Sequence, residues 1–339
     1  MATLKTYMHI SDLHFAGPNQ RSWYDPIAQY LPFLDGLVGH DPGNLFRLEG
    51  CYKLLRKSEP DLELVVTGDL TAQSINSEFD EAENFLGRRQ SGFPFSGLGN
   101  SNWAKFSVPG NHDQWPGKPF TMLGHCNARV RAMYPYNASI VPSVSLPNGV
   151  PVVFLALNGD ADVGPFSSDR FLARGSLVSA IQTMRRMLRG RNTHEIRILL
   201  LHHSVEFPGK RLPGLPHIRA LEIDDLSRNE LAHLIEEFDI RVILTGHAHE
   251  PFHVGFVHGL YGRAGFGVLE ARCGTTTQRL ANDLNNLLVH RIMRNDVDGS
   301  LWWHSALYVH RAAGTEQVFS AAGAQFGNRS AQGKIQIYP

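Results

Sequence analysis

Short apolar runs that alternate with helical patterns are the feature that most restricts how this chain folds. Each run is rich in Val, Ile and Leu and is bounded by polar or turn residues, as buried strands are. The runs are Tyr7–Ile10, Leu62–Val66, Val152–Leu157, Ile196–Leu201 and Arg241–Leu244. Because helical segments lie between them, the alternation predicts an α/β fold.

Amphipathic helices are predicted between these strands from the spacing of apolar residues. They cover 79–86, 177–188 and 231–238. Ser77 with Asp80, and Ser227 with Glu230, have the spacing of a capping box at a helix start. Gly190 follows the middle helix and is a typical residue just beyond a helix end. These signals set the expected helix boundaries.

The last part of the chain, from about Gly267, changes to β-like segments joined by polar stretches. These segments, 268–272, 287–293 and 301–309, are predicted to complete a second sheet. Two earlier stretches, Phe15–Leu45 and Phe207–Ile218, contain several Gly and Pro residues and fit the alternation poorly. Because long irregular loops are often functional, we expect these two to influence substrate choice.

The chain length bears on domain organisation. At 339 residues it exceeds the usual size of one domain, yet α/β enzymes often hold this length in one domain with insertions. We therefore expect a single catalytic domain over 1–339. Its core motifs would lie within 7–250, followed by strands and a C-terminal tail in 251–339.

Polar side chains gather where the apolar runs end. Ligands of open α/β sheets bind outside the carboxyl ends of the strands, so these side chains are expected at one edge. The run Phe106–Val108 is interpreted as a further strand of this kind. In chain order the polar groups are Asp12 and His14, Gly68 and Asp69, Gly110 to Asp113, His202 and His203, and Gly246, His247 and His249.

The chemistry of these groups points to metal ions. Asp, Asn and His supply oxygen and nitrogen ligands without thiolates, which suits Mn, Fe or Zn ions in a working site better than a structural zinc. Seven or more ligands are too many for one ion. Two ions about 3.5–4 Å apart that share a carboxylate would use them all, and that arrangement clamps the attacking and leaving oxygens of a phosphoryl displacement.

Each piece alone also has an ordinary structural interpretation. Gly-Asp after a strand is a common turn, and a single Asp-x-His is often a turn residue followed by a surface imidazole. His247 and His249 form the strongest piece, because residues two apart in an extended segment project to the same side. The joint occurrence of all pieces in order favours the functional interpretation.

In this order, the segments ISDLH, TGDLT, PGNHD, LLHH and TGHAH resemble the motifs of the calcineurin-like metallophosphoesterase superfamily. They span residues 12 to 249, about three quarters of the chain. The resemblance implies a four-layer αββα sandwich of two mixed β-sheets flanked by helices. It also implies a centre with two divalent metal ions at the strand ends.

The resemblance further assigns roles to individual residues. One ion would be held by Asp12, His14 and His249, the other by Asn111, His202 and His247, with Asp69 as the bridge. His202 is preferred over His203 because the ligand usually follows the apolar strand directly. His112 would contact phosphate and protonate the leaving oxygen, with Asp113 orienting it. A hydroxide between the ions would attack phosphorus, giving a hydrolase of phosphodiesters, with phosphomonoesters as the alternative.

Details of the motifs favour one branch of the superfamily. GDLTAQS lacks the tyrosine of purple acid phosphatases and the arginine of protein serine/threonine phosphatases. Gly-Asp-Leu-Thr, with adjacent histidines later in the chain, is similar to class III cyclic-nucleotide and glycerophosphodiester phosphodiesterases. Small nucleotides or glycerophosphodiesters are therefore the favoured substrates. Ser204 and Val205 stand where many of those enzymes have proline.

Charge and cysteine content limit partners and location. Lys+Arg and Asp+Glu number 32 each, so no global field would attract nucleic acid or an anionic membrane. The three cysteines are widely spaced and the start lacks a leader pattern, which predicts a cytoplasmic protein with no membrane span. Two alternatives stay open: a non-catalytic metal-binding scaffold with the same fold, and a DNA-processing nuclease of the same superfamily.

The remaining histidines and a basic cluster are first given structural interpretations. His9 lies within the first strand and is expected in the core or behind the ligands. His253, His258, His290, His304 and His310 are expected to be structural. Arg47, Lys53, Arg56 and Lys57 are expected to form a solvated helix face, with contact to a substrate phosphate as the alternative.

Overall fold

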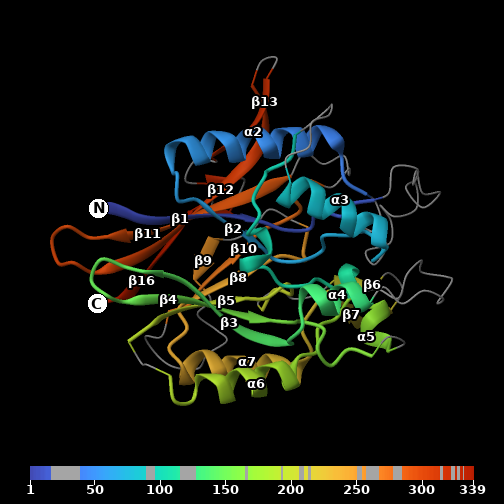
Figure 1. Cartoon of the computed structure of the whole chain (residues 1–339). Helices are drawn as coiled ribbons and strands as arrows, with labels where there is room; N and C mark the ends of the chain where they lie inside the picture. The colour runs from blue at the N-terminus through green and yellow to red at the C-terminus, as the bar shows by residue number, and fades with distance from the viewer. Residues whose placement is uncertain are drawn as a thin grey trace.

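The computed structural model consists of two packed β-sheets covered by helices on both outer faces (Figure 1). Most of the chain is described. The described residues are 1–16, 39–88, 96–114, 127–164, 167–191, 194–205, 210–212, 215–249, 254–256, 267–277, 285–313, 316–321, 325–326, 329–330 and 332–339.

The first sheet has the strand order β13-β12-β11-β1-β2, and β16 also pairs with β12. β1 runs parallel to β2 and antiparallel to β11, so the sheet is mixed. Its strands join the start of the chain to its end. Their bounds are β1 Ala2–Ile10, β2 Glu63–Val66, β11 Asn286–Arg294, β12 Leu301–Ala313, β13 Glu316–Ala321 and β16 Gln332–Tyr338.

The second sheet has the order β3-β4-β5-β8-β10-β9. Its central strands β4, β5, β8 and β10 are parallel, whereas β3 and β9 pair antiparallel at the edges. The bounds are β3 Ala138–Ser145, β4 Pro151–Leu157, β5 Ile196–Leu200, β8 Val242–Thr245, β9 Val254–Phe256 and β10 Leu269–Arg272. The last quarter of the chain thus contributes strands to both sheets.

Helices complete the four layers, and the predicted αββα sandwich is confirmed. α2 (Pro42–Ser58) and α3 (Asn76–Gly87) cover the first sheet, and α6 (Val178–Leu188) and α7 (Asp225–Glu237) cover the second (Figure 1). The described chain also contains shorter elements. They are η2 (Trp103–Phe106), η3 (His112–Gln114), α4 (Asn127–Met133), α5 (Ser168–Phe171) and the hairpin of β6 (Lys210–Leu212) and β7 (Leu215–Ala220), while β14 (Gln325–Phe326) and β15 (Arg329–Ser330) form a separate pair.

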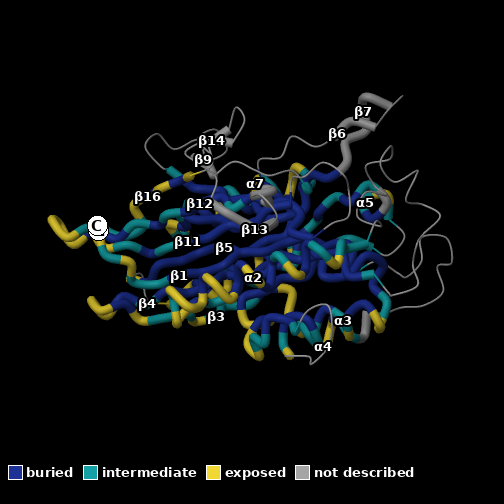
Figure 2. The backbone as a smooth tube through the Cα atoms, turned by 90° about the horizontal axis from the view of Figure 1, so that it is seen from above, coloured by how far each residue is buried: buried dark blue, intermediate teal, exposed yellow. Residues whose placement is uncertain are grey.

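Alternation along the strands explains why the layers have separate apolar cores. In β1, Tyr7 packs in the core between the two sheets, while Met8 and Ile10 pack in the core beneath α2 and α3. A third core lies between the second sheet and α6 and α7. Successive side chains of a strand point to opposite faces, so strands in this position must be apolar on both. Figure 2 shows the resulting band of buried chain through the sandwich.

Several local predictions are corrected by the structure. Phe106–Val108 is not a strand: Trp103–Phe106 is a 3-10 turn, and Ser107 makes only an isolated bridge to Val66. α3 begins after Ile75, whose backbone N–H donates to Glu78 at 3.3 Å, so its start is not at Ser77. Helix α7 is capped by Asp224, whose side chain accepts from the Ser227 N–H. In both helices the side chain that accepts from N–H groups at the helix start is not the predicted serine: it is Glu78 in α3 and Asp224 in α7.

The two long stretches predicted as irregular are partly ordered elements. α2 begins at Pro42 within the first stretch, and the β6–β7 hairpin begins within the second and ends at Ala220, beyond it. Residues 17–38, 206–209 and 213–214 lie outside the described part of the chain. Gly190 has a φ of +96° directly after α6, which confirms it as the residue just beyond that helix.

The shared direction of the strands determines where the functional site lies. β1 is parallel to β2, and β5 is parallel to β8, so within each sheet the carboxyl ends of these strands meet at one edge. Gly246 follows β8 and His202 follows β5. The backbone N–H of Gly246 donates to the His202 carbonyl oxygen at 2.9 Å. Asp12, after β1, accepts at Oδ2 from the His247 N–H at 3.0 Å, which joins the two sheets there.

Candidate metal centre

The residues predicted as ligands converge at this edge in two groups that share Asp69. In each group the candidate donor atoms all lie within 4.8 Å of one another. We call Asp12, His14, Asp69 and His249 the first half-site. We call Asp69, His202 and His247, together with the adjacent Asn111, the second half-site.

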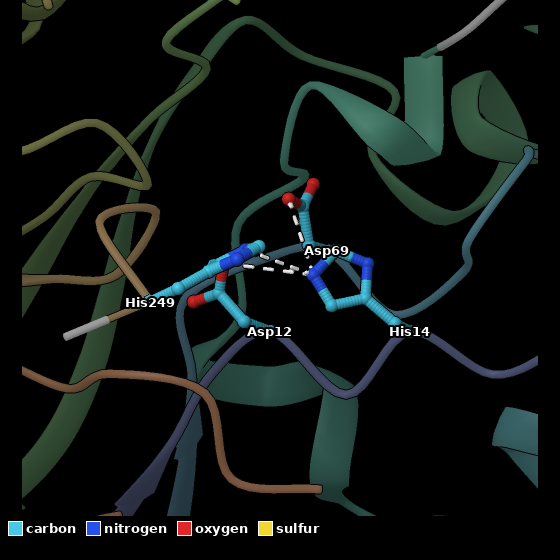
Figure 3. A group of neighbouring side chains, drawn as sticks. All are labelled: Asp12, His14, Asp69 and His249. Atoms are coloured by element: carbon cyan, nitrogen blue, oxygen red, sulfur yellow. Dashed lines mark hydrogen bonds and ion pairs between the residues drawn. The ribbon is translucent and has the colours of Figure 1, made fainter. Parts of the chain in front are cut away.

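In the first half-site, imidazole nitrogens point at carboxylate oxygens (Figure 3). His249 Nε2 lies 3.1 Å from Asp12 Oδ1, and His14 Nε2 lies 3.1 Å from His249 Nε2. His14 Nε2 is also 3.9 Å from Asp12 Oδ1 and 4.0 Å from Asp69 Oδ2. The two imidazoles and two carboxylates therefore surround one small volume.

The second half-site has an equally compact arrangement. His202 Nε2 lies 3.2 Å from Asp69 Oδ2, 3.1 Å from Asn111 Oδ1 and 3.1 Å from His247 Nδ1. His202 Nδ1 donates to Thr67 O at 2.5 Å, and His247 Nε2 donates to Ala173 O at 3.1 Å. A carbonyl can only accept, so these two nitrogens carry the protons and the opposite nitrogens face the centre.

The donor atoms are arranged as ligands of a cation. Asp12 Oδ1 and Asp69 Oδ2 are buried and have no hydrogen-bond partner within the described structure. His247 Nδ1 and His202 Nε2 meet at 3.1 Å although each ring already donates from its other nitrogen. Buried carboxylate oxygens without donors, and opposed imidazole nitrogens, are costly unless a positive ion lies between them. The residues therefore fit divalent metal ions.

The main chain at five residues of the centre has a left-handed conformation that residues other than glycine rarely adopt. Asp12, His14, Asp69, His247 and His249 have φ between +48° and +73°. A left-handed conformation at a residue other than glycine costs free energy and is concentrated at functional sites. The turns after the strands thus place these side chains at an energetic cost that only the site explains.

Gly110 shows how tightly the two motif loops approach. A Cβ at this position would overlap Asp69 Oδ1 and the Asp69 backbone nitrogen. The glycine therefore allows the loop that carries Asn111 to lie directly on the proposed bridging carboxylate. The His112 N–H then donates to Asp69 Oδ1 at 2.8 Å, which leaves Asp69 Oδ2 for the two half-sites.

His112 lies beside the first half-site. Its ring is 5.0 Å from the His14 ring between centroids, and Nδ1 donates to Ala72 O at 2.9 Å. The Asp113 carboxylate accepts from Gly110 N, Thr71 N and Thr71 Oγ1 at 2.9–3.1 Å. In the structure a main-chain carbonyl holds the His112 ring, and Asp113 holds the loop.

Burial and mutual charge shift the pKa values of the centre in both directions. Burial raises the pKa of Asp69, but His202 and His112 outweigh it and hold that pKa well below its usual range. Burial lowers the pKa of His14 to about 3 and holds that of His247 well below its usual value. For His202, burial lowers the pKa, but the Asp69 carboxylate outweighs it and raises the pKa to about 9. His14 and His247 are therefore neutral at pH 7, the state in which an imidazole binds a metal ion. The Asp69 carboxylate instead favours a proton on His202, which a bound cation would displace.

The structure separates the adjacent histidines at the end of β5. His202 belongs to the second half-site, whereas His203 lies on its outer side, 4.4 Å from His247 between ring centroids. His203 Nε2 lies 3.6 Å from Asp160 Oδ1. Asp160 and its partner Arg170 are buried and received no role in the sequence analysis. No motif marks them, because their spacing matches no known ligand pattern.

Threonine hydroxyls support the strand-end loops and also escaped the sequence analysis. Thr275 Oγ1 donates to Asp12 O at 2.9 Å, and Thr277 Oγ1 donates to Leu13 O at 2.7 Å, both beside the first half-site. Thr67, whose carbonyl accepts from His202, has its hydroxyl 2.8 Å from His9 Nε2. The run Thr275 to Thr277 in the sequence was the available signal.

His9 begins a buried polar chain through the first sheet. His9 Nδ1 lies 3.2 Å from His290 Nε2, and His290 Nδ1 lies 2.7 Å from Ser305 Oγ. Burial lowers the pKa of His9 to about 3 and holds that of His290 well below its usual value, so both rings are neutral. His9 is thus buried behind the candidate ligands, and His290 is a core residue. His304 is half-buried. The described part of the chain does not include His253, His258 or the side chain of His310.

With this geometry, comparison with known proteins gives the family. The calcineurin-like phosphoesterase family model matches residues 5–251. The chain belongs to the calcineurin-like phosphoesterase family. The family and the Asp and His clusters together indicate divalent metal ions as cofactors. No curated protein gives a significant sequence match.

Solved structures with a similar fold include the phosphopantetheinyl hydrolase of Mycobacterium tuberculosis. It is 13% identical, with a TM-score of 0.41, over 81% of this chain and 91% of that chain. The NAD nucleotidase of Haemophilus influenzae is 12% identical, with a TM-score of 0.37, over 94% of this chain and 53% of that chain. A Vps29 double mutant from Entamoeba histolytica is 11% identical, with a TM-score of 0.32, over 94% of this chain and 99% of that chain.

The surface gives two further findings. Among the described helices, none is long and apolar enough to cross a membrane. The basic cluster predicted on a helix lies on α2, where Lys53 pairs with Glu49 and Arg56 donates to the Tyr52 hydroxyl at 3.2 Å. Arg47 donates to Asn44 Oδ1 at 2.5 Å. These contacts fit the structural interpretation of the cluster.

Proposed function

We propose that the protein hydrolyses phosphoester bonds with two divalent metal ions, one in each half-site. The observation that carries the proposal is the pair of donor clusters joined by the Asp69 carboxylate. Two clusters with one shared carboxylate match the arrangement that clamps both oxygens of a phosphoryl displacement. The ligands would be Asp12, His14 and His249 on one side, and Asn111, His202 and His247 on the other, with Asp69 between them.

When bound, the two ions would supply positive charge that stabilises the phosphoryl group and a water of lowered pKa. Manganese, iron and zinc are the ions that this donor set favours. The chain supplies orientation: carbonyls of Thr67 and Ala173 fix the tautomers of His202 and His247. It also supplies a low-dielectric surrounding, because all the ligands except His249 are buried.

His112 is proposed as the catalytic residue outside the ligand set. Its Nδ1 is held by the Ala72 carbonyl, so Nε2 is the nitrogen that would give a proton to the leaving oxygen. Asp113 would act through the loop, because its carboxylate holds the backbone of Gly110 and Thr71. These contacts fix the loop on which His112 stands.

Phosphodiesters of small molecules are the proposed substrates, with cyclic nucleotides and glycerophosphodiesters favoured by the likeness of GDLT and the paired histidines to class III phosphodiesterases. The balanced charge of the chain disfavours nucleic acid. We also propose one metallophosphoesterase domain over 1–339 and a cytoplasmic location. Pairing of β1 with β11 supports the single domain, since it joins both ends of the chain in one sheet.

The proposal is tested by measuring metal content and hydrolysis together. Purified protein loaded with Mn²⁺ is expected to bind two ions per chain and to hydrolyse bis-p-nitrophenyl phosphate faster than p-nitrophenyl phosphate. The variant His112→Ala should keep both ions and lose activity by about 10²- to 10⁴-fold, the usual range for a general acid. A substrate panel of cyclic nucleotides, glycerophosphodiesters and monoesters then assigns the class.

Other outcomes separate the alternatives. Two bound ions without hydrolysis of any ester would support a non-catalytic scaffold. Cleavage of single- or double-stranded DNA ends in preference to small diesters would support the nuclease. Loss of metal from His112→Ala would make that residue a ligand and contradict its proposed role.

A further inference from the structure

A buried ion pair lies behind the second half-site, between the loop after β4 and helix α5, neither of which carries a family motif. Asp160 follows β4, and Arg170 is on α5; the Arg170 guanidinium pairs with Asp160 Oδ2. Their side chains are 1% and 5% exposed. Taking two charges out of water is expensive, and such pairs are best explained where they fix an arrangement that apolar side chains would not specify.

Arg170 connects this loop to the loop that carries Asn111. Its Nη1 donates to Asn111 O at 3.4 Å, and its Nη2 donates to Val163 O at 3.4 Å. The same two loops are joined a second time by Gln114 and Asn158, whose amides exchange hydrogen bonds of 3.0 and 3.1 Å. The main chain at Asn111 is therefore held from the side of β4.

Asp160 also faces His203, which packs against His247 of the second half-site. Its Oδ1 lies 3.6 Å from His203 Nε2, and the His203 ring packs 4.4 Å from the His247 ring between centroids. The packing around His203 is close: a Cβ on Gly159 would collide with His203 Nδ1. His203 thus fills the space between Asp160 and His247.

The two carboxylate oxygens therefore lead to different ligands. Oδ2 acts through Arg170 on Asn111, and Oδ1 faces His203, which backs His247. The ligands of the first half-site have other supports among the described residues, including Thr275 on Asp12. A defect in the Asp160 cluster should consequently reach one half-site and not the other.

We propose that Asp160, Arg170 and His203 form a positioning unit that sets the affinity of the second half-site for its metal ion. The inference rests on the proposed two-ion function. None of the three is a ligand in this assignment. Each acts through a ligand, so the effect should appear in ion binding whether or not substrate is present.

The test uses Mn²⁺ alone as the probe. Metal-free full-length protein is titrated by calorimetry, and electron paramagnetic resonance reports whether two bound Mn²⁺ ions are coupled. In Asp160→Asn and Arg170→Met the second ion is expected to bind about 10- to 100-fold more weakly, the range seen when groups behind metal ligands are removed. The first ion should bind as in the wild type, and the coupled signal should be lost at limiting Mn²⁺.

Matched controls lie close by. Arg174→Met removes an arginine four positions along that makes a partly buried pair with Asp169 at 3.3 Å. Asp162→Asn changes an exposed carboxylate that accepts from the Ser179 N–H at 2.8 Å. Both should bind two ions like the wild type. If a single variant fails to fold, the double variant Asp160→Asn with Arg170→Met removes both charges together. It is expected to fold, because no buried charge is left unpaired, and to keep the selective defect.

The outcomes are distinguishable. Folded Asp160 and Arg170 variants that bind both ions like the wild type would overturn the positioning role. Equal weakening of both ions would also overturn it, because the effect would then be general. A wild-type protein that binds fewer than two ions would instead refute the proposed function, and this inference with it.

Discussion

The two half-sites are built from similar residues but are held in place by different means. In the first, all four residues have positive φ, with values from 48° to 53°. In the second, Asp69 and His247 have positive φ, while Asn111 and His202 are not among the described residues that do. The histidines of the second half-site instead donate to main-chain carbonyls. His14 Nδ1, in contrast, has no hydrogen-bond partner in the described part of the chain.

This contrast shows two solutions to the same problem. A ligand can be aimed by the backbone turn that carries it, or its ring can be fixed by a hydrogen bond from the far nitrogen. The second solution sets the tautomer and raises the basicity of the ring as well as its direction. We therefore expect each histidine of the second half-site to contribute more to ion affinity than each histidine of the first. Ion binding in the first half-site should depend more on the left-handed backbone at its ligands.

The largest expected effect comes from the residue that the half-sites share. Asp69→Asn keeps the shape but removes the charge that both ions would use, so both should bind more weakly. Activity should fall by at least roughly 10³-fold, because the clamp on both oxygens is lost. Metal analysis and the diester assay check this. A variant that retains two ions and full activity would show that Asp69 is not the bridge.

An intermediate effect is expected from one ligand of each half-site. His14→Ala should release the first ion and keep the second, while His247→Ala should do the reverse. Each loss of affinity should exceed the roughly 10- to 100-fold that follows removal of a group behind a ligand. Stoichiometry after dialysis against limiting Mn²⁺ gives the measurement. If either substitution removes both ions, the half-sites are not independent and the comparison fails.

The smallest expected effect comes from the hydroxyls behind the ligands. Thr67→Val keeps the carbonyl that holds His202 but leaves His9 Nε2 without its 2.8 Å partner, while Thr275→Val frees the Asp12 carbonyl. Each should lower stability by about 1–3 kcal/mol, because a buried polar group loses its partner. Thr67→Val should weaken the second ion by up to about 10-fold and Thr275→Val the first.

Paired thermal unfolding and Mn²⁺ titration make these two variants controls for each other. Both remove one hydroxyl and keep the side-chain shape. Weakening of the same ion by both variants would contradict the idea that each half-site has its own support.

The sequence was most informative where the position of a side chain follows from the end of the strand that carries it. The positions of Asp12, Asp69 and His247 follow from apolar runs and turns that are local in the chain, so their convergence could be predicted. The helices were also predicted, because their apolar spacing is local. The preference for His202 over His203 came from position after the strand, and the structure places His202 among the donors.

Features that depend on distant contacts could not be predicted. The run Phe106–Val108 looked like a strand, but it meets Val66 only at an isolated bridge, since pairing depends on the neighbour and not on the run itself. Arg170 and Asp160 look like surface charges in the sequence. They are buried because the loop after β4, helix α5 and the loop of Asn111 come together around them. The hydrogen bonds from Gly110 and Thr71 to the Asp113 carboxylate likewise depend on tertiary packing and cannot be read from the sequence.

Under the proposed function, the left-handed turns at Asp12, His14, Asp69, His247 and His249 would set metal binding against backbone stability. At each of these positions glycine would relieve backbone strain of about 1 kcal/mol or more, and each such relief would delete a ligand. Selection for heat resistance alone would therefore tend to erode the centre one turn at a time. Persistence of the five residues requires continued selection for what they hold, and their loss in a relative would mark a protein that kept the sandwich and abandoned the chemistry.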